Sequence, residues 1–291
     1  MTRTLVVGVD GSSESLAAAD WGAQEAVRRN ARLRIVHAWL WQPLELPLAQ
    51  ERATEAARVR DILKAAEEDL ADRYPQLDLT ADLVEDAVVP ALLQAGRAAE
   101  TLVLGSRGHG AVLGFLLGSH GQQVIAAAQC PVVSVRHAKE AQGLGAGQGE
   151  IVVGQQGGVE ESGEVLRFAF ETAASRNAVV RAVRAWNLPP VYAYSPGSMW
   201  VADQFGGLEP YEKAALAQAL EPWRDKYPHV KVVEHVEMGS GAEVLLTTAS
   251  QAGLLVVGRR RRQSHVGMRI GSVAHAALHL ARCPVAVVPH G

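Results

Sequence analysis

The sequence of 291 residues has room for two domains of ordinary size. With 48% hydrophobic and 20% charged residues it has the composition of a packed globular protein, and its net charge of −3 argues against a dedicated nucleic-acid binder. No apolar run approaches the length of a membrane span or of a signal-peptide core, and two cysteines do not make a disulfide framework, so we expect a cytoplasmic protein.

Strand and helix patterns alternate through the first half of the chain. Residues 4–9 form a β-branched apolar run without polar alternation, which is typical of a buried parallel strand. Residues 77–84 alternate more and indicate an edge strand. The order β-α-β-α-β-α-β-α-β predicts a doubly wound parallel sheet of the α/β class. The predicted strands are 4–9, 33–39, 77–84, 101–104 and 131–136, and the predicted helices are 13–29, 48–73, 88–99 and 118–129.

The second half of the chain repeats the first. Cys130 and Cys283, each followed by proline, lie 153 positions apart, and LVVGVDGS at 5–12 matches IVVGQQGG at 151–158. The repeat predicts two copies of a unit of about 140 residues. The two cysteines are then counterparts, and burial explains them better than a redox role. We expect domain 1 at 1–137, domain 2 at 150–291 and a Gly-rich linker at 138–149, with the strands of domain 2 near 151–154, 179–185, 230–237, 254–258 and 284–288.

A glycine-rich stretch, GSRGHGAVLGFLLGS at 105–119, follows the fourth predicted strand and precedes a helix. Glycines let a backbone approach a ligand closely, and a helix N-terminus offers N–H groups to phosphates. The spacing Gly105-x2-Gly108-x9-Gly118-Ser119 is neither a Walker A loop nor the dinucleotide GxGxxG pattern. The stretch is therefore a candidate phosphate site, or it is an ordinary loop whose glycines only allow the chain to turn.

In a doubly wound sheet the ligand crevice lies where the winding reverses, which is between the first and fourth strands if the first strand is central. Asp10 follows the first strand and would accept hydrogen bonds from ribose hydroxyls, or would cap the helix that starts near Ser13. Ser119 and the N–H groups after Gly118 would hold phosphate oxygens, or Ser119 would be only an N-cap.

At this point the sequence resembles the universal stress proteins in their tandem two-domain form. The resemblance rests on Val7-Gly8-Val9-Asp10-Gly11-Ser12, on the long spaced glycine motif and on the Cys-Pro-Val endings of both halves. It implies two five-stranded parallel sheets of strand order 3-2-1-4-5 with helices on both faces. It also implies ATP binding, because many members bind ATP while others that lack the motif bind none.

Carried over onto this chain, the resemblance implies a nucleotide site in domain 1. Asp10 would hold the ribose and adenine side of ATP, and Ala38 would pack against adenine. Arg107 would pair with phosphate oxygens, unless it is a solvated loop charge. The implied nucleotide-binding residues are Gly8, Val9, Asp10, Ala38, Leu104, Gly105, Arg107, Gly108, Gly118, Ser119 and His120.

Domain 2 departs from the pattern. Gln156 stands where Asp10 stands, and Arg261 stands where Gly108 stands and would crowd the approach of backbone to phosphate. Our hypothesis is that domain 1 binds ATP and domain 2 binds it weakly or not at all. Residues 259–262 are four arginines, which form a solvated basic loop or a patch for phosphates or an acidic partner. The long loop at 187–207 carries Tyr192, Tyr194, Trp200 and Phe205, which we expect to pack onto their own domain rather than to line a groove or a domain contact.

His275 and His279 have the i, i+4 spacing of two zinc ligands, but no HExxH and no third ligand accompany them, so we predict no metal site. We also see no catalytic residues. The leading interpretation is an ATP-binding regulator in stress physiology, with ATP alone or with Mg²⁺ as ligand, acting as a homodimer with an unidentified protein partner and without nucleic acid or membrane. The alternatives are an interaction protein of the same fold that binds no nucleotide, and a slow ATPase.

Overall fold

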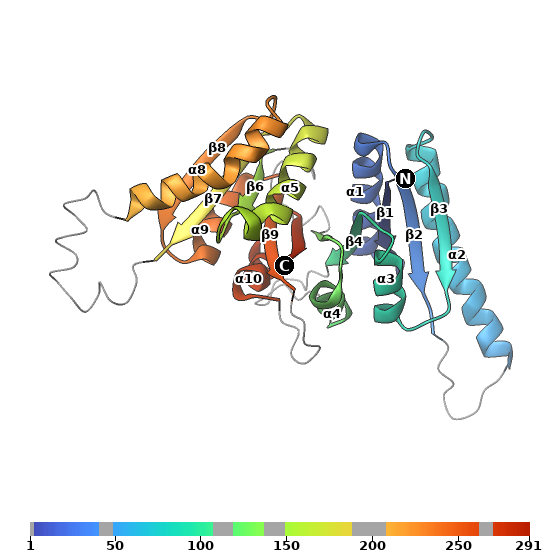
Figure 1. Cartoon of the computed structure of the whole chain (residues 1–291). Helices are drawn as coiled ribbons and strands as arrows, with labels where there is room; N and C mark the ends of the chain where they lie inside the picture. Colours follow the sequence, from blue (N-terminus) through green and yellow to red (C-terminus); the bar gives the residue numbers. More distant parts are fainter. Residues whose placement is uncertain (1–2, 41–48, 107–118, 137–148, 188–207, 262–269) are drawn as a thin grey trace. The chain divides into compact units, whose positions relative to one another are not determined.

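We describe the protein from a computed structural model, which covers residues 3–40, 49–106, 119–136, 149–187, 208–261 and 270–291. The chain divides into two compact units. Unit 1 contains the elements from β1 to β5, and unit 2 contains those from β6 to β10 (Figure 1). The predicted aromatic loop residues Tyr192, Tyr194, Trp200 and Phe205 lie outside the described residues.

Unit 1 alternates strands and helices as predicted. Its long apolar run becomes a central strand in which Leu5, Val6 and Val7 are almost completely buried. Pro90 falls in the first turn of a helix, where its missing N–H has no helical partner to lose. The elements are β1 (Thr4–Gly8), α1 (Ser13–Arg29), β2 (Arg32–Ala38), α2 (Ala49–Arg73), β3 (Leu79–Val84), α3 (Val88–Gly96), β4 (Thr101–Ser106), α4 (Ser119–Ala127) and β5 (Val132–Arg136).

The strands of unit 1 are parallel and follow the order β3-β2-β1-β4-β5, which confirms the predicted order. Helices α1 and α2 pack on one face of this sheet, and α3 and α4 pack on the other (Figure 1). Because both faces are covered, the strands next to the centre carry apolar side chains on both sides. Trp21 of α1 is the largest side chain of unit 1 that is almost completely buried.

Unit 2 repeats this architecture with the order β8-β7-β6-β9-β10. Helices α5 and α8 cover one face, and α9 and α10 cover the other. Asn177 is the C-cap of α5 as Asn30 is the C-cap of α1, and both residues are in the left-handed conformation. The elements are β6 (Ile151–Gly154), α5 (Val159–Arg176), β7 (Val180–Trp186), α8 (Glu209–Lys226), β8 (Val232–Met238), α9 (Gly241–Thr248), the 3-10 turn η1 (Ala249–Gln251), β9 (Leu254–Arg260), α10 (Ser272–Leu280) and β10 (Val285–His290).

The prediction of a solvated arginine loop at 259–262 is wrong for Arg259, and Arg260 belongs to a strand although its side chain is exposed. Strand β9 extends to Arg260, because β10 continues alongside it and pairs Arg260 with His290. Arg259 is only 7% exposed. Arg262 lies outside the described residues.

Both cysteines are buried, Cys130 at 8% and Cys283 at 7% exposure, as the repeat suggested. Within the described part of the chain, no helix combines the length and apolar character needed to cross a bilayer.

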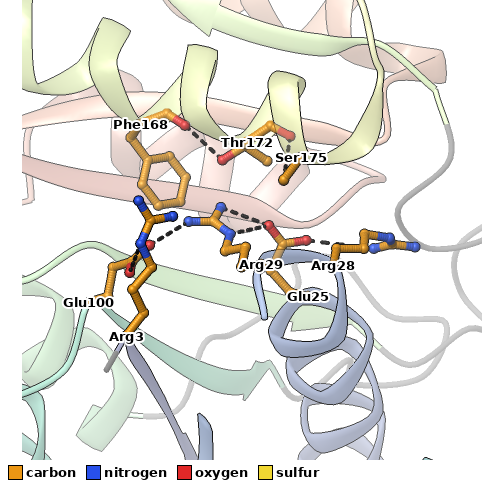
Figure 2. Close-up of polar contacts among 8 residues, drawn as sticks. All are labelled: Arg3, Glu25, Arg28, Arg29, Glu100, Phe168, Thr172 and Ser175. Carbon is orange, nitrogen blue, oxygen red and sulfur yellow. Dashed lines mark hydrogen bonds and ion pairs between the residues drawn. The ribbon is translucent and has the colours of Figure 1, made fainter. Parts of the chain in front are cut away.

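A cluster of charged side chains in unit 1 lies where α1 ends (Figure 2). Arg29 Nη2 lies 2.7 Å from Glu25 Oε1, and Arg29 Nη1 lies 2.8 Å from Glu100 Oε1. The side chains of Glu25 and Arg29 are only 1% and 3% exposed. Burial opposes the charge of Arg29, but the two carboxylates outweigh it, so the pKa of Arg29 lies above its ordinary value.

Two glycines, one in a helix and one in a strand, should respond oppositely to a methyl group. A Cβ on Gly163, inside α5, would meet nothing within 4 Å, whereas a Cβ on Gly105 in β4 would lie 2.5 Å from the backbone carbon of Glu14. We expect Gly163→Ala to stabilise the protein by about 1 kcal/mol and Gly105→Ala to destabilise it by about 1–3 kcal/mol. Thermal unfolding of the two variants tests this, and equal shifts in the same direction would contradict it.

Candidate functional site

The candidate site lies at the carboxyl ends of β1 and β4 in unit 1. These two strands are parallel neighbours, with Leu5 paired to Thr101 and Val7 to Val103, so their ends reach the same edge of the sheet. From β1 the chain winds to β2 and β3 on one side and to β4 and β5 on the other. The winding therefore reverses between β1 and β4, which is where ligands of open α/β sheets bind.

Asp10 is exposed and holds the turn that starts α1. Its Oδ1 atom accepts hydrogen bonds from the backbone N–H of Ser12, at 3.0 Å, and from the Ser12 hydroxyl. Ser12 is the N-cap, and its Oγ accepts the N–H of Ser15 at 3.2 Å. Asp10 is thus not the cap itself, as one alternative had it, but the residue that orients the cap.

Gly11 lets the chain turn between the strand and the helix. Its φ of +82° lies in the region that favours glycine, and a Cβ there would lie 2.9 Å from Ile62 of α2. Gly157 repeats this turn in unit 2 with a φ of +80°. The two loops therefore share one backbone form although their side chains differ.

The structure brings most of the predicted site residues to this edge, but it limits what some of them can offer. The side chain of Val9 is 4% exposed and its N–H donates to Val36 O at 2.9 Å, so only its carbonyl could reach a ligand. Leu104 is 5% exposed and faces the space beside Gly8, on the side of α3. Ala38 is half-buried at the end of β2.

Gly105 was predicted to lie along a nucleoside, and the structure shows a second reason for a glycine at this position. The space a side chain would need is filled by the backbone of Glu14 and Ser15, at the start of α1. The glycine therefore permits close packing of a helix on β4, whether or not its backbone also faces a ligand.

Helix α4 begins at Ser119, and Ser119 and His120 are both exposed. In unit 2 the N-cap of α10 is Gly271, so Ser272, the counterpart of Ser119, is the first residue inside the helix. Arg107, Gly108 and Gly118 lie outside the described residues.

Sequence reasoning missed His37, which lies next to this loop. His37 follows Val36, the register partner of Gly8, and is 8% exposed. Burial lowers the pKa of His37 below its ordinary value, and the nearby Asp10 carboxylate opposes this shift. The missed signal was the pair of corresponding endings, VHAW at 36–39 and VRAW at 183–186, which differ at this position.

In unit 2 the corresponding residue, Arg184, is bonded to the loop. Its Nη1 donates to Gln155 Oε1 at 2.6 Å and to the carbonyl of Gly157 at 3.2 Å, and its Nε donates to Glu212 of α8. Gln156, which replaces Asp10, is exposed. The Arg184 guanidinium therefore links the unit 2 loop to strand β7 of the sheet.

Charged side chains also meet at the start of α5. Arg260, the counterpart of Arg107, lies 3.8 Å from the Glu161 carboxylate, and Glu161 folds back over Gly157. Arg261 donates its backbone N–H to His290 O at 2.7 Å. An acidic side chain of the protein itself thus stands beside the arginine that would correspond to a phosphate ligand.

The His275 and His279 rings lie with their centroids 4.3 Å apart on α10. In the described ranges, no group of three or more His, Cys, Asp or Glu side chains is placed to hold a metal ion.

The fold and the site together define a tandem pair of doubly wound α/β units, each with a tight loop and a helix start at its switch point. The chain belongs to the universal stress protein family, whose sequence model matches residues 1–136 and again 149–289. A universal stress protein of Mycobacterium tuberculosis (strain ATCC 25618 / H37Rv) is 35% identical over 293 residues, which cover 97% of this chain and 96% of the relative. A second one from that strain is 31% identical over 301 residues, with 97% and 94% coverage.

A solved structure supports the fold. The crystal structure of a universal stress protein from Archaeoglobus fulgidus DSM 4304 matches with a TM-score of 0.73 and 15% identity, covering 99% of this chain and 98% of that one. The tandem α/β architecture is therefore shared over the whole length.

Proposed function

We propose that this universal stress protein is an ATP-binding regulator of the stress response and that unit 1 holds the ATP. The observation that carries the proposal is the Asp10 carboxylate, which is exposed at the end of β1 where the winding of the sheet reverses. Membership of the stress protein family supports the physiological role.

The chemistry of the described residues fits the two ends of the nucleotide. A carboxylate accepts hydrogen bonds from both ribose hydroxyls, and the start of α4 at Ser119 offers an exposed hydroxyl and backbone N–H groups to phosphates. Arg107, Gly108 and Gly118 complete the phosphate side of the proposal, with Mg²⁺ as an optional companion of the phosphates. Adenine would lie against Ala38, beside the backbone of Gly8, Val9, Leu104 and Gly105.

The proposal gives unit 2 little or no nucleotide. Gln156 offers no negative charge to ribose, and Arg260 already has Glu161 beside it. ATP in unit 1 would shift the balance between conformations that a partner recognises.

We place this function in the cytoplasm, where ATP is plentiful, and we expect a homodimer that acts on a protein partner. Exposed strand edges favour such pairing. Light scattering of the purified chain tests the dimer, and a monomer at all concentrations would contradict it.

The first test is the nucleotide content of freshly purified, heat-denatured protein, measured by chromatography of the released small molecules. We expect about one ATP per chain, as one working site in unit 1 requires. Two ATP per chain would show that unit 2 also binds. No ATP, together with no binding in a titration, would overturn the proposal in favour of an interaction protein, and ADP released during incubation would indicate a slow ATPase.

A further inference from the structure

A buried arginine ends the fifth strand of unit 1, at the edge of the sheet where the candidate site lies. Arg136 is the last residue of β5 and is the register partner of Ser106, the last residue of β4. Arg136 is only 9% exposed. It is not among the nucleotide-binding residues that the glycine motif implies, so its charge at this edge calls for an explanation of its own.

Arg136 lies on the face of the sheet that α3 and α4 cover. Successive side chains of a strand point to opposite faces. A Cβ on Gly105 would lie 2.5 Å from the backbone carbon of Glu14 in α1, so the next residue, Ser106, lies on the other face. Register partners in parallel strands share a face, and Arg136 therefore lies on this face too.

Helix α4 begins at the same edge of the sheet. It connects β4 to the parallel strand β5, so it must start beyond the carboxyl end of β4 and run back towards the amino end of β5. Ser119, its first residue, is exposed. The helix start and Arg136 thus share one edge and one face, and both a helix N-terminus and a guanidinium attract anions.

Unit 2 also buries an arginine at this level of the sheet, but on the neighbouring strand. Arg259 of β9 takes the position of Ser106 and is the register partner of Pro289, which takes the position of Arg136. Arg259 is 7% exposed, and it lies on the face of α9 and α10 because Gly258 before it faces α5. Two different strands thus supply a guanidinium at the same level, which indicates that this level suits a positive charge.

We propose that Arg136 contacts the phosphate chain of ATP in unit 1. A buried charge needs polar groups around it, and phosphate oxygens match the planar fork of a guanidinium. The five N–H donors of an arginine can serve a protein group and a phosphate oxygen at once. The inference rests on the proposed function and deepens it, because it adds a phosphate contact from β5 that lies outside the glycine motif.

The first experiment compares titrations with ATP and with adenosine. We expect Arg136→Gln to weaken ATP binding about 10-fold or more, because a charge-assisted hydrogen bond is lost. The same variant should bind adenosine as the wild type does, because adenosine carries no phosphate. An arginine with only a structural role would change both affinities alike or neither of them.

Two matched variants control for the loss of positive charge. Arg259→Gln removes an arginine of similar burial from unit 2, and Arg97→Gln removes an exposed arginine at the end of α3, before β4 begins. Both should leave the ATP affinity as it is. Should Arg136→Gln fail to fold, Arg136→Lys keeps the charge but loses the fork, and it should weaken ATP binding more than adenosine binding.

The second experiment needs no nucleoside and uses tripolyphosphate as the probe. A ligand that binds the folded state raises the melting temperature. Tripolyphosphate should therefore raise the melting temperature of the wild type and of Arg259→Gln, and it should raise that of Arg136→Gln much less. Each variant is compared with itself without the probe, so a change in its basal stability does not affect the result.

The outcomes separate this inference from the proposed function. Equal ATP affinities of the wild type and Arg136→Gln would overturn the inference and leave the proposed function standing, and so would a loss that adenosine binding shares. No ATP binding by the wild type would overturn the proposed function. Tripolyphosphate then decides the inference: a melting-temperature shift that depends on Arg136 upholds the phosphate contact, and an equal shift or none overturns it.

Discussion

Replacing Asp10 by alanine is expected to weaken ATP binding about 10- to 100-fold, because hydrogen bonds to a charged group contribute about 1.5–3 kcal/mol. The carboxylate stands at the switch point of the sheet, and one of its oxygens already receives the N–H and the hydroxyl of Ser12. The ribose hydroxyls would donate further hydrogen bonds to the Asp10 carboxylate, which the loop has already oriented. Isothermal titration of the variant with ATP measures the loss.

Two control variants distinguish loss of a ligand contact from damage to the helix start. Ser12→Ala removes the N-cap of α1 but keeps the Asp10 carboxylate, so it should cost about 1 kcal/mol of stability and weaken ATP binding much less. Gln156→Ala makes the matching change in unit 2 and should leave ATP binding as it is. Unchanged affinity in Asp10→Ala, or a loss in Gln156→Ala, would show that the site is not in unit 1.

Most element boundaries follow from patterns that are local in the sequence. The alternation of strands and helices and the 153-residue repeat were enough to predict two doubly wound parallel sheets. The strand order with the first strand at the centre came from the resemblance to the family. The end of β9 was missed because Arg259 and Arg260 are charged, and only pairing with β10 makes them part of a strand.

The candidate site was predictable only in part, because its chemistry depends on register. Asp10 and Ala38 could be named from a motif and a strand end. The role of Ser12 as cap was also within reach, since Ser12 and Ser15 have the spacing of a hydroxyl cap. The position of His37 was not, because its proximity to Asp10 depends on the register in which β1 pairs with β2.

A second large effect is expected in unit 1 at Glu25. Glu25→Ala should lower the free energy of unfolding of this unit by about 3–5 kcal/mol, because it leaves the buried Arg29 guanidinium without its nearest carboxylate. The two side chains are 1% and 3% exposed and lie 2.7 Å apart, and Glu100 with Arg3 lies on the other side of Arg29 (Figure 2). Hydrogen exchange of the buried β1 amides measures the stability of unit 1 by itself.

The repeat supplies a matched control for this prediction. Counted back from the C-caps Asn30 and Asn177, Thr172 of α5 takes the position of Glu25, and its hydroxyl donates to Phe168 O at 2.7 Å (Figure 2). Thr172→Ala removes a neutral hydrogen bond and should cost about 1 kcal/mol in unit 2. Lys64→Ala breaks an exposed pair with Glu68 and should cost less than about 0.5 kcal/mol.

The three variants separate the effect of charge from that of burial. If Glu25→Ala lowers the free energy of unfolding no more than Lys64→Ala does, then the cluster around Arg29 contributes as little to stability as a surface ion pair. Other interactions would then compensate for the burial of the Arg29 charge. If it costs about as much as Thr172→Ala, the hydrogen bond matters and the charge does not. Only a loss of unfolding free energy well above that of both control variants shows that unit 1 depends on a buried carboxylate at the position where unit 2 has a hydroxyl.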